Sequence, residues 1–376
     1  MTLENIPFHK PHITEDEIKA VTDVLLTGWL SMGPKTLEFE QEFRNKIGTS
    51  HALSTNSGTA ALHLALKAIG LKPEDEVILP TNTFIATAEV VTYFNARPVL
   101  CDIEENTHNM DVALLEKLIT KRTKAIIPVH FGGQPCDMNE IVAIANQYNL
   151  KIIEDAAHAL PSFYENQMIG TIGDITCFSF YNTKTLSTAE GGMITTNNDD
   201  YARSIRINRL HGIDADFWGR YGQKGSWYYQ VVDNGHKYNT TDINSALGLT
   251  QLKKLEWMWS RRDDIASEYT KAFSENKKII TLTIKPQRKT SWHLYVIKVN
   301  HRDELLEKLK SEKIGTSVHF IPVHKHPFYQ STYGYIDEHY PVANRVFEKS
   351  LSLPIYPSMT DEQRNYVIDR VLKYAT

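Results

Sequence analysis

The stretch Cys177-Phe-Ser-Phe-Tyr-Asn-Thr-Lys-Thr-Leu-Ser-Thr-Ala-Glu-Gly-Gly192 is the most informative part of this 376-residue chain. An apolar run brings Ser179 and Lys184 into a loop of small residues, and a second apolar run begins where the loop ends. The amine of a lysine in a partly desolvated, electropositive site has a lowered pKa and can attack an aldehyde. Most lysines that follow a strand are solvated surface charges, so this interpretation needs support from other segments.

Two other segments give that support. Lys151–His158 has the pattern of a buried strand with Asp155 at its C-terminal end, where open α/β sheets bind ligands. A carboxylate there can hold the ring-nitrogen proton of pyridoxal phosphate (PLP), or it can simply cap the following turn. In Ser54–Leu66, a turn of small residues opens an amphipathic helix. Its backbone N–H groups and the hydroxyls of Ser57 and Thr59 could hold a phosphate, and an ordinary helix N-cap is the alternative.

In this order the three segments supply a phosphate site, a partner for a pyridinium ring and a lysine for imine chemistry. Nearly end to end, the chain resembles the DegT/DnrJ/EryC1/StrS family of PLP-dependent sugar aminotransferases. Further resembling segments are Gly28–Pro34 with Phe39-Glu40, Pro80–Phe84, Pro128–Met138, His211–Ile213, Gly235–Ile243 and His319–His324. So many dispersed matches in the same order make the resemblance specific.

The resemblance implies an α/β fold of the aspartate-aminotransferase type (fold type I). The expected large domain spans residues 1–260, with an N-terminal helical segment at 1–50 and a mainly parallel sheet that carries helices on both faces. Residues 261–376 are expected to form a small C-terminal α+β domain. The sequence itself alternates short Val- and Ile-rich runs with longer periodic segments, which favours a parallel sheet covered on both sides.

The same resemblance implies roles for individual residues. Lys184 is expected to bind the PLP aldehyde and to shuttle protons, and Asp155 to keep the pyridine nitrogen protonated. Dehydratase relatives have histidine in place of this lysine, so Lys184 favours aminotransfer. The other expected cofactor contacts are Ser57, Gly58, Thr59 and Ser179 at the phosphate, Phe84 stacked on the ring, His158 near the phenolic oxygen, and Lys237. The expected substrate contacts are Tyr181, Trp218, Arg220, Tyr229 and His324.

Two positions depart from the family pattern. Lys237 stands where many relatives carry an asparagine that reaches the phosphate of the neighbouring subunit, and a lysine could do this with a full charge. Ala189 stands where glycine is usual before Glu-Gly-Gly, and the change could tighten the loop after Lys184.

The resemblance predicts a homodimer with shared active sites that exchanges an amino group between L-glutamate, which becomes 2-oxoglutarate, and a nucleotide-diphosphate keto-sugar. PLP would pass through its pyridoxamine form. Amination at carbon 4 and a UDP-linked sugar are expected from the commonness of such relatives, and the product would feed surface polysaccharide, such as lipopolysaccharide O-antigen, or other glycan synthesis. The alternatives are a PLP-dependent sugar dehydratase and a non-catalytic regulatory protein of the same fold.

Composition limits the other functional classes. The net charge is −4 and there is no basic block, which argues against nucleic acid as a main partner. Neither a signal pattern nor an apolar run of the ~20 residues needed to cross a bilayer is present, so we expect a cytoplasmic protein with no membrane partner. Cys101, Cys136 and Cys177 are predicted to be buried free thiols. The spacing of His319, His324 and His326 does not suit a metal site, and no metal is expected.

Several secondary-structure elements are predicted from local signals. A hydroxyl cap and an acidic first turn start a helix at Thr14, which should run to about Leu26 and stop before Gly28. The gap between 175–180 and 192–196 is too short for a helical crossover, so an antiparallel pair is expected there. Further predicted helices include 242–257, continuing toward 264, 302–313 and one that starts at 360. Predicted strands are 291–299 and 316–320, and the aperiodic segment 210–240 is expected to be a functional loop.

Overall fold

The structure is a computed structural model that describes residues 5–214 and 228–375. Its centre is a seven-stranded sheet with the order β1-β9-β8-β5-β4-β2-β3. These strands are β1 (His51–Thr55), β2 (Glu76–Pro80), β3 (Arg97–Cys101), β4 (Thr123–Ile126), β5 (Lys151–Asp155), β8 (Ile175–Ser179) and β9 (Gly192–Thr196). All run parallel except β9, which is antiparallel to both of its neighbours. The predicted fold class and the predicted antiparallel pair are therefore both confirmed.

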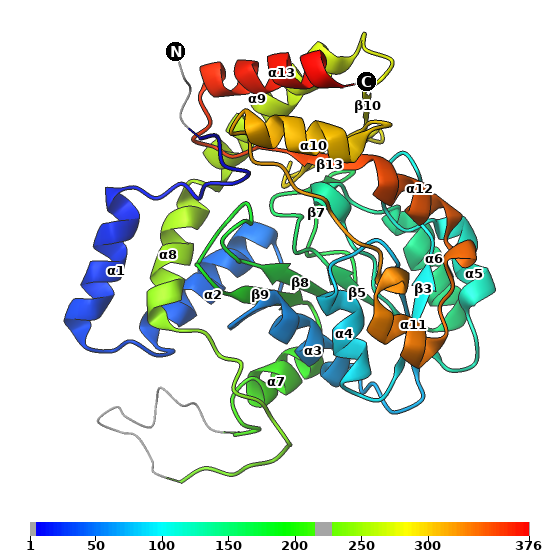
Figure 1. Ribbon diagram of the computed structural model, residues 1–376. Helices are drawn as coiled ribbons and strands as arrows, with labels where there is room; N and C mark the ends of the chain where they lie inside the picture. Colours follow the sequence, from blue (N-terminus) through cyan, green and yellow to red (C-terminus); the bar gives the residue numbers. More distant parts are fainter. Residues whose placement is uncertain (1–4, 215–227, 376) are drawn as a thin grey trace.

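Helices cover both faces of this sheet (Figure 1). Adjacent strand residues alternate between two apolar clusters: Ile78 belongs to one and Leu79 to the other. This alternation is the consequence of a strand's two-residue period, and both residues are fully buried. One face carries α3 (Gly58–Ala68), α4 (Ala86–Thr92) and α7 (Asp199–Asn208), and the other carries α2 (Pro34–Ile47), α5 (Leu115–Leu118), α6 (Met138–Tyr148) and α8 (Asp242–Lys253).

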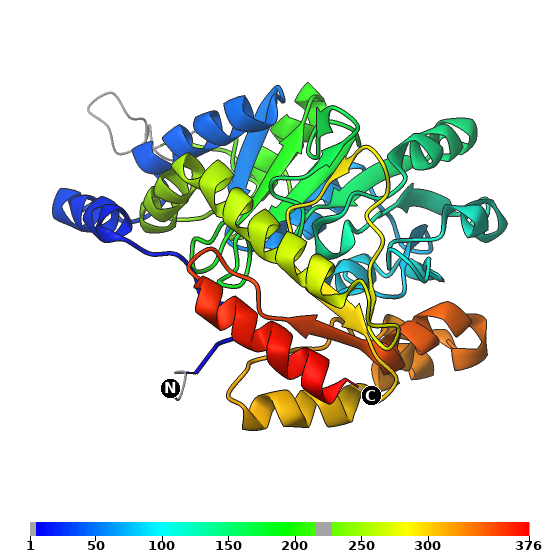
Figure 2. The same ribbon diagram turned by 90° about the horizontal axis from the view of Figure 1, so that it is seen from above.

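The N-terminal helix α1 (Glu15–Thr27) has the ends predicted from the sequence. The backbone N–H of Thr14 donates to Glu17 Oε2 at 2.8 Å as part of a capping box, and Gly28 ends the helix at φ 72°. Helix α1 contacts α8 and projects from the body of the molecule (Figure 2). A single helix was predicted to run on from residue 242. The structure has two helices there, α8 and α9 (Leu255–Phe273), separated at Lys254.

A second core lies under the three-stranded sheet β10-β12-β13. The strands are β10 (Ile280–Thr281), β12 (Tyr295–Lys298) and β13 (Ser350–Leu353), covered by α10 (Arg302–Ser311), α13 (Asp361–Tyr374) and α9. Ile6, near the start of the described residues, is part of this core. Its N–H donates to the carbonyl of Lys313 at 2.9 Å. The predicted strand at 316–320 is reduced to one bridge between Ser317 and Ser352.

The predicted division at residue 260 does not coincide with the two cores. Helices α11 (Pro327–Tyr333) and α12 (Pro341–Lys349) follow that division, yet Tyr329 and Val346 pack in the core of the large sheet. Residues 261–376 thus contribute to both cores, and the first residues of the chain contribute to the smaller one. Short 3₁₀ helices lie at Val112–Leu114, Phe131–Gly133, Val323–Lys325 and Asp337–His339.

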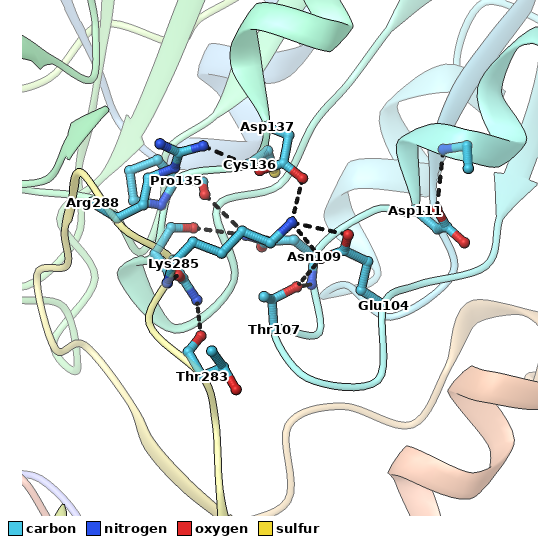
Figure 3. A network of polar contacts seen from close by, with 12 residues as sticks. Glu104, Thr107, Asn109, Asp111, Pro135, Cys136, Asp137, Thr283, Lys285 and Arg288 are labelled. Atoms are coloured by element: carbon cyan, nitrogen blue, oxygen red, sulfur yellow. Dashed lines mark hydrogen bonds and ion pairs between the residues drawn. The ribbon is translucent and has the colours of Figure 1, made fainter. Parts of the chain in front are cut away.

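A polar network fastens the segment 283–289 to the large-sheet side (Figure 3). Lys285 Nζ lies 2.9 Å from Glu104 Oε2 and also pairs with Asp137, which receives a second hydrogen bond from Arg288. Arg288 belongs to a small sheet in which β11 (Arg288–Lys289) pairs with β6 (Phe163–Tyr164), and β6 pairs with β7 (Gln167–Met168). This arrangement anchors the strand that leads into β12 next to the large sheet.

The three cysteines are free and buried, as predicted. Among the described residues, no helix is both long enough and apolar enough to span a membrane.

Candidate active site

The turn between β1 and α3 forms an anion site. Ser57 caps α3, its hydroxyl accepting a hydrogen bond from the N–H of Ala60 at 3.0 Å. A Cβ added to Gly58 would lie 2.9 Å from the Cβ of Ser179, so only glycine lets the turn approach the end of β8. The first N–H groups of an α-helix have no intrahelical partner and attract anions. Ser57, Gly58, Thr59 and Ser179 all line one cavity at this point, as the phosphate prediction requires.

Asp155 ends β5 inside the protein. Thr87 Oγ1 donates to its Oδ2 at 2.7 Å, and the N–H of Ala157 donates to its Oδ1 at 3.1 Å. Thr87 Oγ1 in turn lies 2.8 Å from Thr83 Oγ1, which helps to hold the carboxylate in one orientation. Burial raises the pKa of Asp155, and the hydrogen bond from Thr87 opposes that rise. The result is a fixed carboxylate that can share a proton with a basic group placed in the cavity.

Lys184 lies five residues beyond the end of β8, in a turn where its N–H donates to the carbonyl of Tyr181 at 2.9 Å. Its half-buried side chain lines the same cavity. Burial lowers the pKa of Lys184 to about 8, while the negative charge of Asp155 acts in the opposite direction. A large fraction of this amine is therefore neutral and nucleophilic slightly above neutral pH.

His158 forms the cavity wall beyond Asp155. Its Nδ1 accepts the N–H of Gly132 at 3.3 Å, which assigns the proton of the neutral ring to Nε2. The ring stacks on Phe320 with centroids 5.8 Å apart and lies 4.3 Å from the ring of His293. Burial, with the positive charge of Lys184, holds the pKa of His158 well below its usual range. A neutral ring with a fixed N–H is suited to donating a hydrogen bond into the cavity.

The cavity that joins these groups has a volume of about 510 Å³. Phe84 lies at its edge with 58% of its surface exposed, and its ring centroid is 5.9 Å from that of Phe320. Tyr181 also lines the cavity, and its contact with the substrate stays a prediction. The lining residues that were not anticipated from the sequence include Phe8, Thr87, His293 and Phe320. Phe320 could have been anticipated, because it follows His319 in a segment that resembles the family. No sequence pattern pointed to Phe8, Thr87 or His293 as cavity residues.

Other predicted site residues lie outside this cavity. Lys237 is exposed, and its carbonyl accepts a hydrogen bond from the side chain of Asn56, next to the phosphate turn. Tyr229 is exposed and does not line the cavity. Trp218 and Arg220 fall in the segment 215–227, outside the described residues.

His324 is placed differently from the prediction. Its side chain is fully buried, with Nδ1 2.6 Å from Thr81 Oγ1 and Nε2 2.9 Å from Asn344 Oδ1. Both ring nitrogens are thus engaged inside the protein, and the residue does not line the cavity. The expectation that His324 contacts the substrate is therefore wrong for this structure; the residue ties the segment after β2 to α12.

The loop after Lys184 contains a strained position. Ala189 has φ 67°, in the left-handed region that costs an alanine about 1–2 kcal/mol. This explains physically why glycine is usual at this position. The loop keeps its shape because the side chain of Asn244 donates to the carbonyls of Thr188 and Glu190 at 2.7 and 2.8 Å.

The donor set fits PLP. The coenzyme carries a phosphate, a basic ring nitrogen and an aldehyde, and the cavity offers a helix N-terminus, a fixed carboxylate and a reactive amine. An α/β sheet with these groups where its strands end therefore has the site of a PLP-dependent enzyme.

Comparison with known proteins agrees. The model of the DegT/DnrJ/EryC1/StrS aminotransferase family matches residues 11–372, and the chain belongs to this family. It is 48% identical over 373 residues to the spore coat polysaccharide biosynthesis protein SpsC of Bacillus subtilis, covering 97% of this chain and 96% of SpsC.

Solved structures give the same result. Spr1654 of Streptococcus pneumoniae, known in PLP and PMP forms, is 35% identical to this chain. In its PLP form it superposes with a TM-score of 0.91 over 99% of this chain and 100% of its own. Helicobacter pylori PseC, an aminotransferase involved in the biosynthesis of pseudoaminic acid, is 29% identical with a TM-score of 0.92 over 99% of both chains. The chain is thus a PLP-dependent sugar aminotransferase, and the predicted class and cofactor are confirmed.

Proposed function

We propose that this enzyme transfers the amino group of L-glutamate to a nucleotide-diphosphate-linked keto-sugar. The observation that carries the proposal is the convergence of Lys184, Asp155 and the Ser57 turn on one cavity. The similarity to SpsC supports a place in surface-polysaccharide biosynthesis. A 4-keto sugar linked to UDP is the specific substrate proposed, on the strength of the family resemblance.

Each residue has a defined task in this proposal. When bound, PLP supplies a carbonyl that exchanges amino groups and a ring that accepts electrons. Lys184 would hold the coenzyme through its amine, and the same amine would serve as the base and acid that moves the proton at the amino carbon. Asp155, buried and fixed by Thr87, holds a proton on the ring nitrogen. His158, whose Nδ1 accepts the N–H of Gly132, would offer its Nε2–H to the phenolic oxygen of the bound coenzyme.

The rest of the wall positions the reactants. Ser57, Gly58, Thr59 and Ser179 bind the phosphate through N–H and hydroxyl groups. Phe84 and Phe320 present flat apolar faces that orient the ring and exclude water. Tyr181 lies at the same mouth and is the substrate contact retained from the sequence prediction.

A homodimer is part of the proposal. Helix α1 and the segment after it expose large apolar side chains: Ile18, Leu25, Leu26, Leu30 and Leu37, with Leu26 81% exposed. Several large exposed apolar side chains within one stretch of the chain favour a protein interface. Lys237 lies beside the phosphate turn at the surface and is proposed to reach the phosphate of the partner's site, with a charge where relatives use an asparagine.

The test is a two-step reaction analysed by mass. Purified enzyme is first treated with glutamate, and loss of the visible absorbance of the bound coenzyme should accompany formation of 2-oxoglutarate. A panel of UDP-, dTDP- and GDP-linked 4-keto and 3-keto sugars is then added, and the product should be an amino sugar. A deoxy sugar would show a dehydratase instead, and no reaction with glutamate or any keto-sugar would show a non-catalytic protein.

A further inference from the structure

His293 is a cavity residue to which the proposed mechanism assigns no task. It precedes β12, lines the cavity and is 6% exposed. Its Nδ1 is buried and has no hydrogen-bond partner among the described residues. A buried polar atom without a partner is costly, so such an atom on a side chain that lines a cavity is a candidate partner for a ligand group.

The backbone at His293 is hydrogen-bonded to Ser291, which also contacts the backbone of His158. The backbone N–H of His293 donates to Ser291 Oγ at 3.2 Å, and Ser291 Oγ donates to the carbonyl of His158. The two imidazole rings therefore face one another at 4.3 Å, one from the large-sheet side and one from the segment before β12. The backbone that carries His293 is thus tied to the backbone of His158 through Ser291.

A buried cation lies behind this wall. Arg262 of α9 is 1% exposed, and its guanidinium donates to the carbonyls of Trp292 and Ile355 at 3.2 and 2.7 Å. Within the described part of the chain, no carboxylate lies within 4.0 Å of it. Its Nε also has no partner there. A buried charge is costly unless it is paired, so this wall carries positive potential that an incoming anion would offset.

The donor brings such an anion to the reaction centre. The α-carboxylate of an amino acid is bonded to the carbon that carries the reacting amine, so it must lie close to Lys184. Lys184 is the one lysine or arginine among the described residues that line the cavity, and the proposed mechanism already uses its amine. The cavity also contains the acidic side chains of Asp155 and Glu190. Among the described residues that line the cavity, protonation of a histidine is a second source of positive charge.

We propose that His293, backed by Arg262, binds the α-carboxylate of the amino donor and takes up a proton when it does so. The proposal deepens the proposed function, and it rests on that function in taking the donor to be an amino acid. The sugar's diphosphate, which is remote from the reacting carbon, would bind elsewhere.

The surroundings of His293 fix the direction of the pH effect. The groups that face it are His158, Lys184, Arg262 and His319, and with burial they hold its pKa well below its usual range. A carboxylate nearby raises that pKa again, so binding favours the protonated ring. Carboxylate affinity should consequently be greatest at low pH and should fall as pH rises through the pKa of His293 in the complex.

The experiment uses glutarate, an unreactive dicarboxylate, with the PLP-loaded enzyme. Calorimetric titration in two buffers of different ionisation enthalpy counts the protons taken up on binding. His293→Gln keeps the size and a hydrogen-bonding group but cannot become charged. It should take up about one proton fewer than wild type and bind glutarate about tenfold more weakly.

The matched control is His108→Gln. Like His293, His108 is a buried histidine. Both of its ring nitrogens lack a hydrogen-bond partner among the described residues, but it does not line the cavity. This variant should keep the wild-type proton count and glutarate affinity. In turnover, His293→Gln should raise the KM for glutamate far more than it changes the keto-sugar half-reaction.

Three results would overturn the inference: no proton uptake by wild type, equal uptake by wild type and His293→Gln, or equal damage to both half-reactions. The first needs no variant, so the inference can be refuted even if His293→Gln fails to fold. Proton uptake without any glutamate half-reaction would leave the carboxylate site standing and refute the proposed function. A normal glutamate half-reaction without proton uptake would do the reverse.

Discussion

The two sides of the active-site cavity are built in different ways. On the large-sheet side, Ser57 and Asp155 lie where β1 and β5 end, and Lys184 follows β8 closely. On the other side, Phe8, His293 and Phe320 come from segments without regular structure. Positions at strand ends are fixed by the sheet's hydrogen bonds, whereas the second group depends on contacts between distant parts of the chain. The geometry of the coenzyme side is therefore set by the sheet and could be predicted from local sequence patterns. The geometry of the opposite side is set by tertiary packing.

Lys184→Ala should have the largest effect. Loss of the amine removes both the covalent attachment and the proton carrier, so turnover should fall by about 10⁴-fold or more, as is typical when a nucleophile that also transfers protons is lost. Steady-state assay and the visible spectrum of the purified protein measure this. Lys253→Ala, an exposed lysine at the end of α8, is the control and should behave as wild type. Full turnover of Lys184→Ala would refute the mechanism.

Asp155→Asn should reduce turnover by about 10²–10³-fold, because a neutral amide cannot stabilise a charge on the ring. The substitution should also shift the pH at which the rate of coenzyme capture is half-maximal. Only the neutral amine captures the coenzyme, so the capture rate of coenzyme-free enzyme should rise as pH passes about 8. Because the carboxylate of Asp155 raises the pKa of Lys184, the variant's midpoint should lie at lower pH, as stopped-flow absorbance would show. Glu190→Gln should leave the midpoint in place, and an upward shift in Asp155→Asn would contradict this electrostatic account.

Lys285→Met tests the opposite side of the cavity. The change leaves Glu104 and Asp137 without their shared cation and should lower the free energy of unfolding by about 1–2 kcal/mol. Urea denaturation measures it, with Lys310→Met as the control, since Lys310 is 74% exposed and should change stability by less than about 0.5 kcal/mol. If the two sides of the cavity are independent, loss of the contacts of Lys285 with Glu104 and Asp137 should raise the KM for substrate more than the Kd for PLP. An equal change in both would show that the two sides are not independent.

Ala189→Gly should have the smallest effect, and it should be stabilising. Relief of the left-handed conformation outweighs the greater entropy of glycine in the unfolded chain, giving about 0.5–1 kcal/mol in urea denaturation. Ala143→Gly, on the exposed face of α6, is the matched control and should destabilise by about 1 kcal/mol. Destabilisation of Ala189→Gly would mean that the loop draws its stability from the methyl group.

Sequence reasoning reached the parts of the fold that local chemistry determines. Thr14 and Gly28 mark the ends of α1, and the short gap after β8 dictates the antiparallel β9. It reached Asp155 because a buried strand that ends in a carboxylate is a local pattern. It could not reach His293 or Phe8, which line the cavity through contacts between distant parts of the chain. His324 misled for the same reason: its burial against Asn344 depends on α12, which is 20 residues further along.

The position of Ile6 has a consequence for biosynthesis. Ribosomes deliver the N-terminus first, yet this residue pairs with Lys313 and Gly315 and belongs to a core made mostly from the last third of the chain. Ile6 therefore cannot find these partners until the ribosome has made the chain beyond residue 315. Phe8, two residues on, lines the cavity together with His319 and Phe320, so the cavity should be complete only after those residues have been synthesised.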